Sequence, residues 1–346
     1  MKHKYQILLF GILMVCILTA YMGCGKDETT VGPTTNSDPN APTYPVTVTV
    51  LNPSGSPQGG VTVTLQNPPK VSTIFTALTD SLGRATIQSP SGVQIIIATM
   101  GTVFQVTVTV NVNATSTPTV VSTPIRLTQV TTATQKVLVV SASAEELENV
   151  LRTIGYTKFD STDIYTMVNR ANTDSIGLLT YLKQYSLIFS DCDGGSEYSS
   201  SYEALSRTYG RYVAQGGKMY GGHYNYYHLG RIWPGYYSDS NRDGQYENFG
   251  DSLQVVDQTL KTALGYSLAS WSSSIDSRRL SGYEKWSAYP SSSKIYAVIY
   301  RTTPSIGVIV ENHIGTGKYL WTDYHNQDIK DDPKLVKIVQ YFLLSM

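Results

Sequence analysis

The sequence predicts two folded parts, an all-β sandwich followed by an α/β part built on a parallel sheet. Between residues 45 and 128, apolar and polar residues alternate with a period of two, as they do in half-buried strands. From residue 136 to residue 346, short apolar runs alternate with helical patterns, which is typical of an α/β fold. Residues 128–135 form a short polar linker where the period changes.

Residues 1–23 have the composition of an export signal. A short basic start is followed by an apolar run over residues 5–22, as in secretory signal peptides. The Gly23-Cys24 junction resembles the cleavage box of bacterial lipoproteins, in which the cysteine thiol receives a diacylglycerol and becomes the new N-terminus. The resemblance implies a lipoprotein of the bacterial cell envelope, anchored through Cys24 and facing the periplasm or the exterior. An uncleaved membrane anchor or an ordinary signal is the alternative.

Residues 24–44 predict a flexible tether behind the lipidated cysteine. Gly, Pro, Thr, Asn and Asp dominate this segment, and it shows no apolar period. Such a segment cannot bury enough apolar surface to offset the entropy that is lost on ordering. We therefore expect it to hold the folded parts away from the membrane.

Charge and cysteine content narrow the kinds of partner. The chain has 26 basic and 26 acidic side chains, so its formal net charge is zero. It has no dense basic patch, and we expect no nucleic-acid partner. Cys192 is the only cysteine after Cys24, so it has no partner for an internal disulfide. We expect a buried thiol there, because free cysteine behaves as a small hydrophobe.

Residues 45–128 contain about seven predicted short strands. Alternating segments such as "VTVTVL" (46–51) and "VTVTLQ" (61–66) are separated by the turn-forming stretches "NPSGSPQGG" and "TDSLGR". Together with the Thr79-Asp80-x-x-Gly83-x-Ala85 turn, they resemble the carboxypeptidase-regulatory-like, or transthyretin-like, sandwich. An immunoglobulin-like module is the close alternative. The segment carries no catalytic constellation, and we expect it to act as a spacer or adhesion module.

The α/β part begins with "KVLVVSAS" at residues 136–143, a continuous apolar run of the kind found in strands buried on both faces. A helical pattern follows over residues 144–154, and Gly155 is placed to end it. The segments that follow are predicted as a strand region (158–166), a helix (175–184), a strand and glycine loop (185–195), a helix (202–217), a short strand and turn (218–224), a helix (224–234), two strands joined by a glycine turn (304–325) and a closing helix (331–346). This order predicts a doubly wound, flavodoxin-like parallel sheet, whose ligands bind at the carboxyl ends of the strands.

Four segments of this part, "VLVVSAS", "LIFSDCDGG", "VAQGGKMYGGHYNYY" and "IGTGKYLWTDYHNQD", resemble the class I glutamine amidotransferase-like superfamily, in particular its exported and trehalose-utilisation-type branches. The resemblance covers residues 136–346. It implies that His223 occupies the position of the nucleophilic cysteine, after a tight turn. It also implies that His325 and Gln327 occupy the His and Glu positions of the triad. The loop that donates oxyanion-hole amides would be Asp191, Cys192, Asp193, Gly194 and Gly195.

Two of the three triad positions implied by the resemblance hold other residues, His223 in place of Cys and Gln327 in place of Glu, which argues against amidotransferase activity. The imidazole of His223 cannot form the thioester that a cysteine forms. Gln327 could hydrogen-bond His325, but it cannot stabilise an imidazolium by charge. The leading hypothesis is a non-catalytic domain that binds a ligand, a glycan or a protein partner.

Two catalytic hypotheses stand beside this one. A hydrolase could use His223 or His325 as a general base on water. A transition metal could be held by these histidines with Cys192 and Asp191 or Asp193, but the sequence has no tight metal-binding spacing, so the signal for a metal is weak.

Residues 239–251 have the spacing of a calcium loop. Oxygen side chains fall at positions 1, 3, 5 and 9, and Gly244 falls at the turn position. Gly250 stands at position 12, where a bidentate acid is usual. The candidate calcium ligands are Asp239, Asn241, Asp243 and Glu247; a plain Asx turn is the alternative. We predict no organic cofactor.

An aromatic run follows the predicted turn at His223. We favour its packing against the sheet over a sugar-stacking wall. Its members are Tyr224, Tyr226, Tyr227, Trp233, Tyr236 and Tyr237.

Overall fold

The computed structural model describes ten stretches of the chain, all within the compact unit Thr35–Met346. They are residues 38–130, 135–143, 146–193, 196–237, 242–246, 253–265, 283–286, 289–299, 306–323 and 333–346. The predicted signal 1–23 and Cys24 lie outside them. Within these stretches, no helix combines the length and the apolar character needed to cross a membrane.

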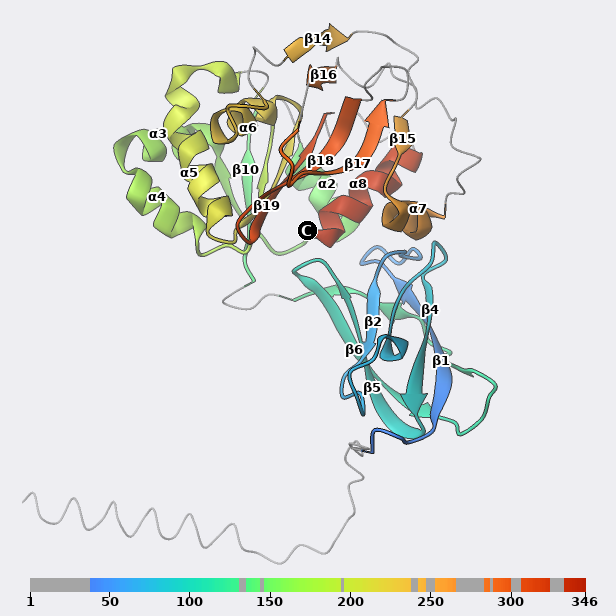
Figure 1. Cartoon of the computed structure of the whole chain (residues 1–346). Helices are drawn as coiled ribbons and strands as arrows, with labels where there is room; N and C mark the ends of the chain where they lie inside the picture. The colour runs from blue at the N-terminus through green and yellow to red at the C-terminus, as the bar shows by residue number, and fades with distance from the viewer. Residues whose placement is uncertain are drawn as a thin grey trace, which may run out of the picture. The chain divides into compact units, whose positions relative to one another are not determined.

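Residues 43–129, called the β part below, form two antiparallel-rich sheets (Figure 1). The strands are β1 (Thr43–Leu51), β2 (Thr62–Leu65), β3 (Thr76–Leu78), β4 (Arg84–Pro90), β5 (Gly92–Met100), β6 (Phe104–Val112), β7 (Thr119–Val120), β8 (Ile125–Arg126) and β9 (Thr128–Gln129). One sheet has the order β4-β1-β7, with β8 also paired to β1, and the other has the order β3-β2-β5-β6-β9. About seven strands were predicted and nine are present, the last three of which, β7 to β9, have only two residues each.

In residues 137–345, called the α/β part, strands and helices alternate as far as residue 232, as predicted, except that a helix begins at Ile164, inside the predicted strand region 158–166. The elements are β10 (Val137–Ser141), α2 (Leu147–Ile154), β11 (Asp160–Asp163), α3 (Ile164–Thr173), α4 (Ser175–Leu182), β12 (Leu187–Ser190), α5 (Glu203–Ala214), β13 (Lys218–Gly222), α6 (Tyr226–Ile232), β14 (Arg242–Tyr246), β15 (Leu253–Val255), α7 (Gln258–Leu264), β16 (Tyr283–Trp286), β17 (Lys294–Ile299), β18 (Ile306–Ile314), β19 (Gly317–Thr322) and α8 (Pro333–Ser345). The predicted stop at Gly155 is confirmed, since this residue caps α2 in the left-handed conformation with φ 103°.

The main sheet of the α/β part has the order β11-β10-β12-β13-β19-β18-β17-β15. The first five strands are parallel. Counted along the chain their order is 2-1-3-4-5, which is the order of flavodoxin-type doubly wound sheets. The prediction of a parallel sheet is therefore confirmed for these five strands and wrong for the other three. β18, β17 and β15 pair antiparallel with their neighbours. For β18 the reason is local, because the turn that joins it to β19 is too short for a parallel crossover. Gly315 in this turn has φ 59°.

Helices cover both faces of this sheet (Figure 1). Side chains alternate along each strand, so Leu138 and Val140 of β10 pack with α3, α4, α5 and α6, whereas Val137 and Val139 pack with α2, α7 and α8. All four valine and leucine side chains are buried. This is the reason why the predicted strand reads as a continuous apolar run.

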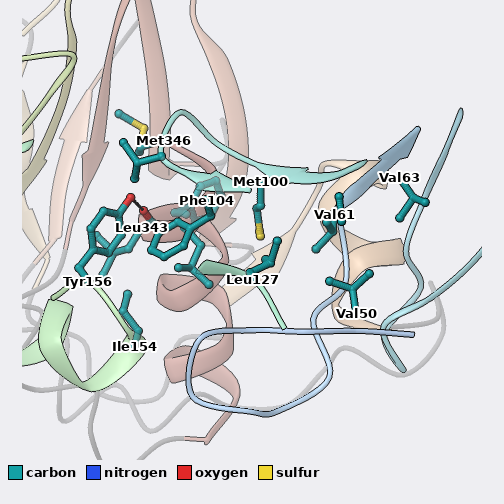
Figure 2. Close-up of a cluster of buried hydrophobic side chains, with 14 of the residues drawn as sticks. Val50, Val61, Val63, Met100, Phe104, Leu127, Ile154, Tyr156, Leu343 and Met346 are labelled. Carbon is teal, nitrogen blue, oxygen red and sulfur yellow. Dashed lines mark hydrogen bonds between the residues drawn. The ribbon is translucent and has the colours of Figure 1, made fainter. Parts of the chain in front are cut away.

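The β part and the second face of the sheet share one hydrophobic cluster (Figure 2). The ring of Phe104 in β6 meets the ring of Tyr156 edge-on, with 4.6 Å between centroids. The Tyr156 hydroxyl donates a hydrogen bond of 2.8 Å to the carbonyl of Leu343 in α8. The cluster therefore joins β6, the end of α2 and the end of α8 into one continuous core.

Candidate functional site

The strands β10, β12, β13 and β19 end at one edge of the sheet, where the predicted site residues Asp191, Cys192, Asp193 and His223 lie. Ser190 pairs with Gly221, and Gly222 pairs with Thr322. The register therefore places His223 level with Asp323, and Asp191 one residue earlier, level with Gly222, at the same edge. Parallel strands gather their carboxyl ends in this way.

His223 lies on a sharp turn from β13 into the 3-10 turn His223–Asn225 and α6, as the sequence predicted. Its φ is 27°, and it is the only non-glycine residue of the described stretches with a positive φ. Such a backbone conformation costs on the order of 1–3 kcal/mol and persists only where the surroundings enforce it. The side chain is 1% exposed, and the main-chain carbonyl accepts a hydrogen bond of 2.8 Å from Trp321 Nε1.

Asn225 holds this turn against the neighbouring strands. Its Nδ2 donates to the carbonyls of Ser190, at 3.4 Å, and Asp191, at 3.1 Å. Its Oδ1 accepts a hydrogen bond of 3.0 Å from the Tyr319 hydroxyl. A Cβ at Gly221 would lie 2.7 Å from that hydroxyl and 2.8 Å from Asn225 Cγ, so the glycine before the turn is required for this packing.

The loop after β12 is bound to the loop after β10, at the point where the strand order reverses. The N–H of Ala142 donates to Asp191 Oδ2 at 3.3 Å, and Ser143 Oγ donates to Asp193 Oδ1 at 3.1 Å. Asp193 Oδ2 accepts a further hydrogen bond from the Tyr202 hydroxyl. Burial and this acidic neighbour raise the pKa of Tyr202 well above its usual value.

Two amides of the predicted oxyanion-type loop are already committed to internal hydrogen bonds. The N–H of Asp191 donates to the Val140 carbonyl at 2.9 Å, and the N–H of Asp193 donates to Glu197 Oε1 at 2.6 Å. The thiol of Cys192 is 0% exposed, which confirms the prediction that it is buried. Gly194 and Gly195 lie outside the described stretches, as do His325 and Gln327.

Sequence reasoning missed two acidic residues of this edge. Asp323, directly after β19, is 0% exposed, and Glu197 in the 3-10 turn Ser196–Tyr198 is 1% exposed. For Asp323 the available signal was its position after the buried run "GKYLWT", at the end of a strand. No pattern in the sequence around Glu197 predicts its burial.

Two side chains of α6, Arg231 and His228, make hydrogen bonds that hold the segments next to this edge. Arg231 donates to the carbonyls of Glu197, at 2.7 Å, Tyr198, at 2.9 Å, and Ser199, at 2.8 Å. His228 Nδ1 lies 2.8 Å from Ser206 Oγ. Burial, with a smaller effect of Arg231, lowers the pKa of His228 to about 3, so this imidazole is neutral at ordinary pH.

The metal hypotheses remain predictions. The described stretches contain no group of three or more His, Cys, Asp or Glu side chains arranged to hold a metal ion. Of the candidate calcium ligands, Asp239, Asn241 and Glu247 lie outside the described stretches. Asp243 falls in β14, whose pairing with β16 shifts register between Arg242 and Gln245.

The aromatic run after His223 divides into buried and surface members. Tyr226 and Tyr237 are 1% and 2% exposed, so the favoured packing role fits them. Tyr224 and Tyr227 are half-buried, and their rings are nearly parallel, 15° apart with 6.3 Å between centroids. Tyr198, which is 70% exposed, lies beside this pair, with its ring centroid 6.2 Å from that of Tyr227 and its plane tilted by 55°. The Tyr224 ring lies 4.0 Å from the ring of His223.

No protein-family model and no curated protein matches the chain. Among solved structures, it is similar to a ThuA-like protein from Bacteroides uniformis, with 12% identity and a TM-score of 0.39 over 60% of this chain and 89% of that one. Two cytoplasmic proteins from Salmonella typhimurium are also similar. The first has 13% identity and a TM-score of 0.40, over 60% of this chain and 97% of that one. The second has 12% identity and a TM-score of 0.39, over 61% of this chain and 100% of that one. These are distant similarities of fold.

Proposed function

We propose that this protein is a lipid-anchored protein of the bacterial cell envelope that binds a glycan on the surface beside His223, without glutamine amidotransferase activity. In this proposal Cys24 carries the lipid and residues 24–44 form the tether. The two sheets of the β part pack as a carboxypeptidase-regulatory-like sandwich that serves as a spacer. The α/β part carries the binding surface.

The surroundings of His223 support the absence of amidotransferase chemistry. An imidazole stands where a thiolate would be needed, and it cannot form a thioester. The amides of Asp191 and Asp193 donate to Val140 and Glu197, so they do not point at a free oxyanion position. We expect the protein to release no ammonia from glutamine.

The observation that carries the glycan proposal is the series Tyr198, Tyr227 and Tyr224 beside the turn. Tyrosine offers a flat apolar face and a polar hydroxyl at a small cost in side-chain entropy. The C–H face of a sugar ring can pack on such a face while its hydroxyls find polar partners. A run of neighbouring rings 6.2 and 6.3 Å apart could therefore contact successive sugar units.

Binding of soluble glycans tests this proposal. The detergent-solubilised full chain and its Tyr198→Ala and Tyr227→Ala variants would be compared by affinity electrophoresis in gels that contain cell-wall polysaccharides. Each variant should bind at least about fivefold more weakly, because truncating an aromatic contact at the centre of an interface costs more than about 1 kcal/mol. Tyr165→Ala is the matched control, since Tyr165 is 55% exposed on α3. No retardation of the unmodified protein by any polysaccharide would refute the proposal.

A second candidate, a hydrolase with His223 as general base, is favoured by the strained turn and by the neighbouring Asp191 and Asp323. Strained backbone is often found at functional sites, and carboxylates can orient an imidazole. The same polysaccharides, incubated with the protein and analysed for fragments, decide between the two. Fragments that disappear in His223→Gln, with binding retained, would establish the hydrolase; recovery of intact polysaccharide supports binding alone.

Membrane attachment has its own test. Cells that express the protein would be labelled with an alkyne analogue of palmitate, and we expect the label on the unmodified chain but not on Cys24→Ser. Incorporation requires a thiol at the cleavage junction, so loss of label in this variant isolates the anchor. If the variant carries as much label as the unmodified chain, the uncleaved anchor is favoured instead. The same holds if neither protein carries label while both remain in the membrane fraction.

A further inference from the structure

A groove with a volume of about 290 Å³ lies on the α/β part between α5, α6 and the end of β18. Three arginines line it: Arg207 and Arg211, one helical turn apart on α5, and Arg231 on α6. Ile232 and Ile314 add apolar surface. The groove thus combines cationic side chains with an apolar lining, which suits an anionic organic ligand.

The charges of this groove are not balanced within the described stretches. Glu203 pairs with Arg207 at 3.1 Å, and both side chains are at least half exposed. Arg211 is exposed and has no acidic partner among the described residues. Burial has the largest effect on the pKa of Arg231 and lowers it. Arg207 lowers this pKa further, whereas Glu203 and Glu197 raise it. An excess of guanidinium charge therefore faces the groove in a chain whose formal net charge is zero.

The groove adjoins the tyrosine series. Tyr227 and Arg231 lie four residues apart on α6, and such residues share one helix face. Arg231 Nη2 also donates to the main-chain carbonyl of Tyr198 at 2.9 Å. The aromatic surface and the arginine groove are thus parts of one continuous face.

We infer that the glycan bound by this face is acidic, with sugar rings on the tyrosines and carboxylate or sulfate groups at Arg207 and Arg211. This inference rests on the proposed glycan-binding function. The planar guanidinium suits both anions, because it can donate two parallel hydrogen bonds to either. The apolar lining accepts the C–H face of the sugar that bears the charge. Arg231 contributes charge, since its Nη donors already hold the carbonyls of residues 197–199.

A matched pair of probes tests the inference on the detergent-solubilised full chain. Calorimetric titration would compare hexagalacturonate with the same hexamer fully methyl-esterified, which keeps the rings and removes the charge. We expect the acid to bind about tenfold more tightly, because two exposed ion pairs each contribute modestly. Added salt should reduce this difference. A sulfated chondroitin hexasaccharide, titrated in parallel, distinguishes sulfate from carboxylate as the preferred group.

Variants separate the arginine groove from the tyrosine series. Arg207→Gln combined with Arg211→Gln should abolish the preference for the acid and leave binding of the ester unchanged. Tyr227→Ala should weaken both probes equally. Arg152→Gln is the control, since Arg152 is similarly exposed, also pairs with a glutamate four residues away, and lies on α2, on the opposite face of the sheet.

The outcomes tell the two proposals apart. If the acid and the ester bind equally well and the arginine variants change nothing, the acidic preference is wrong while glycan binding stands. If neither probe nor the chondroitin oligosaccharide binds, the acidic-glycan inference is overturned; the polysaccharide gels then decide whether glycan binding itself survives. A preference that persists in the double variant would also overturn the assignment to Arg207 and Arg211.

Discussion

At the scale of single residues, acidic and imidazole side chains of the described stretches are buried where the parallel strands end. They are Asp191, Asp193, Glu197, His223, His228 and Asp323, each at most 2% exposed. Buried charge is costly unless it is hydrogen-bonded. Asp193 meets this requirement through Ser143 and Tyr202, and Glu197 through the Asp193 amide. These bonds fix the loop after β12, so a ligand at this edge meets a preformed surface.

His228 makes the stability of the fold depend on pH. Its pKa is about 3 in the folded protein, against an ordinary value of 6.5, so below pH 6.5 the unfolded chain binds a proton that the folded chain rejects. The stabilisation is fully present above pH 6.5. It is lost as the pH falls towards 3, at about 1.4 kcal/mol per pH unit.

The substitution His228→Gln checks this dependence. Urea unfolding at pH 7, 6, 5 and 4 should give a free energy of unfolding that falls less steeply for the variant than for the unmodified protein, by about 1.4 kcal/mol per pH unit below pH 6. The variant should be less stable at pH 7, because its amide does not reproduce the contact with Ser206. Parallel curves for the two proteins would mean that His228 is not the group responsible.

At the scale of elements, the sequence predicted the turn at His223 because its signals are local. A short strand, two glycines and a helical pattern lie within residues 218–232, and the structure has β13, the 3-10 turn and α6 there. The alternating strands of the β part were predictable for the same reason. Each of these patterns depends on residues a few positions apart.

The glycine turn predicted the pair β18 and β19, but the antiparallel strands β17 and β15 of the main sheet were not predicted. Apolar runs do not say which strand lies beside them or in which direction it runs. The register of Gly222 with Thr322 brings Asp323 level with His223 from a position 100 residues later. Likewise the arginine groove joins α5 to α6 and β18, and Tyr198 reaches Tyr227 across 29 residues of chain. Residues that long-range pairing brings together have no characteristic spacing in the sequence, so they could not be recognised from it.

At the scale of the whole molecule, the β part and the α/β part depend on each other through their shared core. Gly101, in the loop after β5, has φ 61°, and a Cβ there would lie 2.3 Å from the Leu344 carbonyl of α8. Gly92, at the start of β5, has φ 90°, and a Cβ there would meet nothing within 4 Å. The two glycines thus share a left-handed backbone and differ in their contact with α8.

This difference yields a test of coupling between the two parts. Alanine at either glycine carries a backbone penalty of about 1–2 kcal/mol, but only Gly101→Ala also forces α8 away, at a further cost of about 1–3 kcal/mol. All four tryptophans lie between residues 233 and 321, in the α/β part, so their fluorescence during urea unfolding reports on that part alone. Because the core is continuous, Gly101→Ala should lower the unfolding midpoint seen by tryptophan clearly more than Gly92→Ala does. Equal midpoints for the two variants would show that the β part and the α/β part unfold independently, and that the contacts at Leu343 and Leu344 transmit no stability between them.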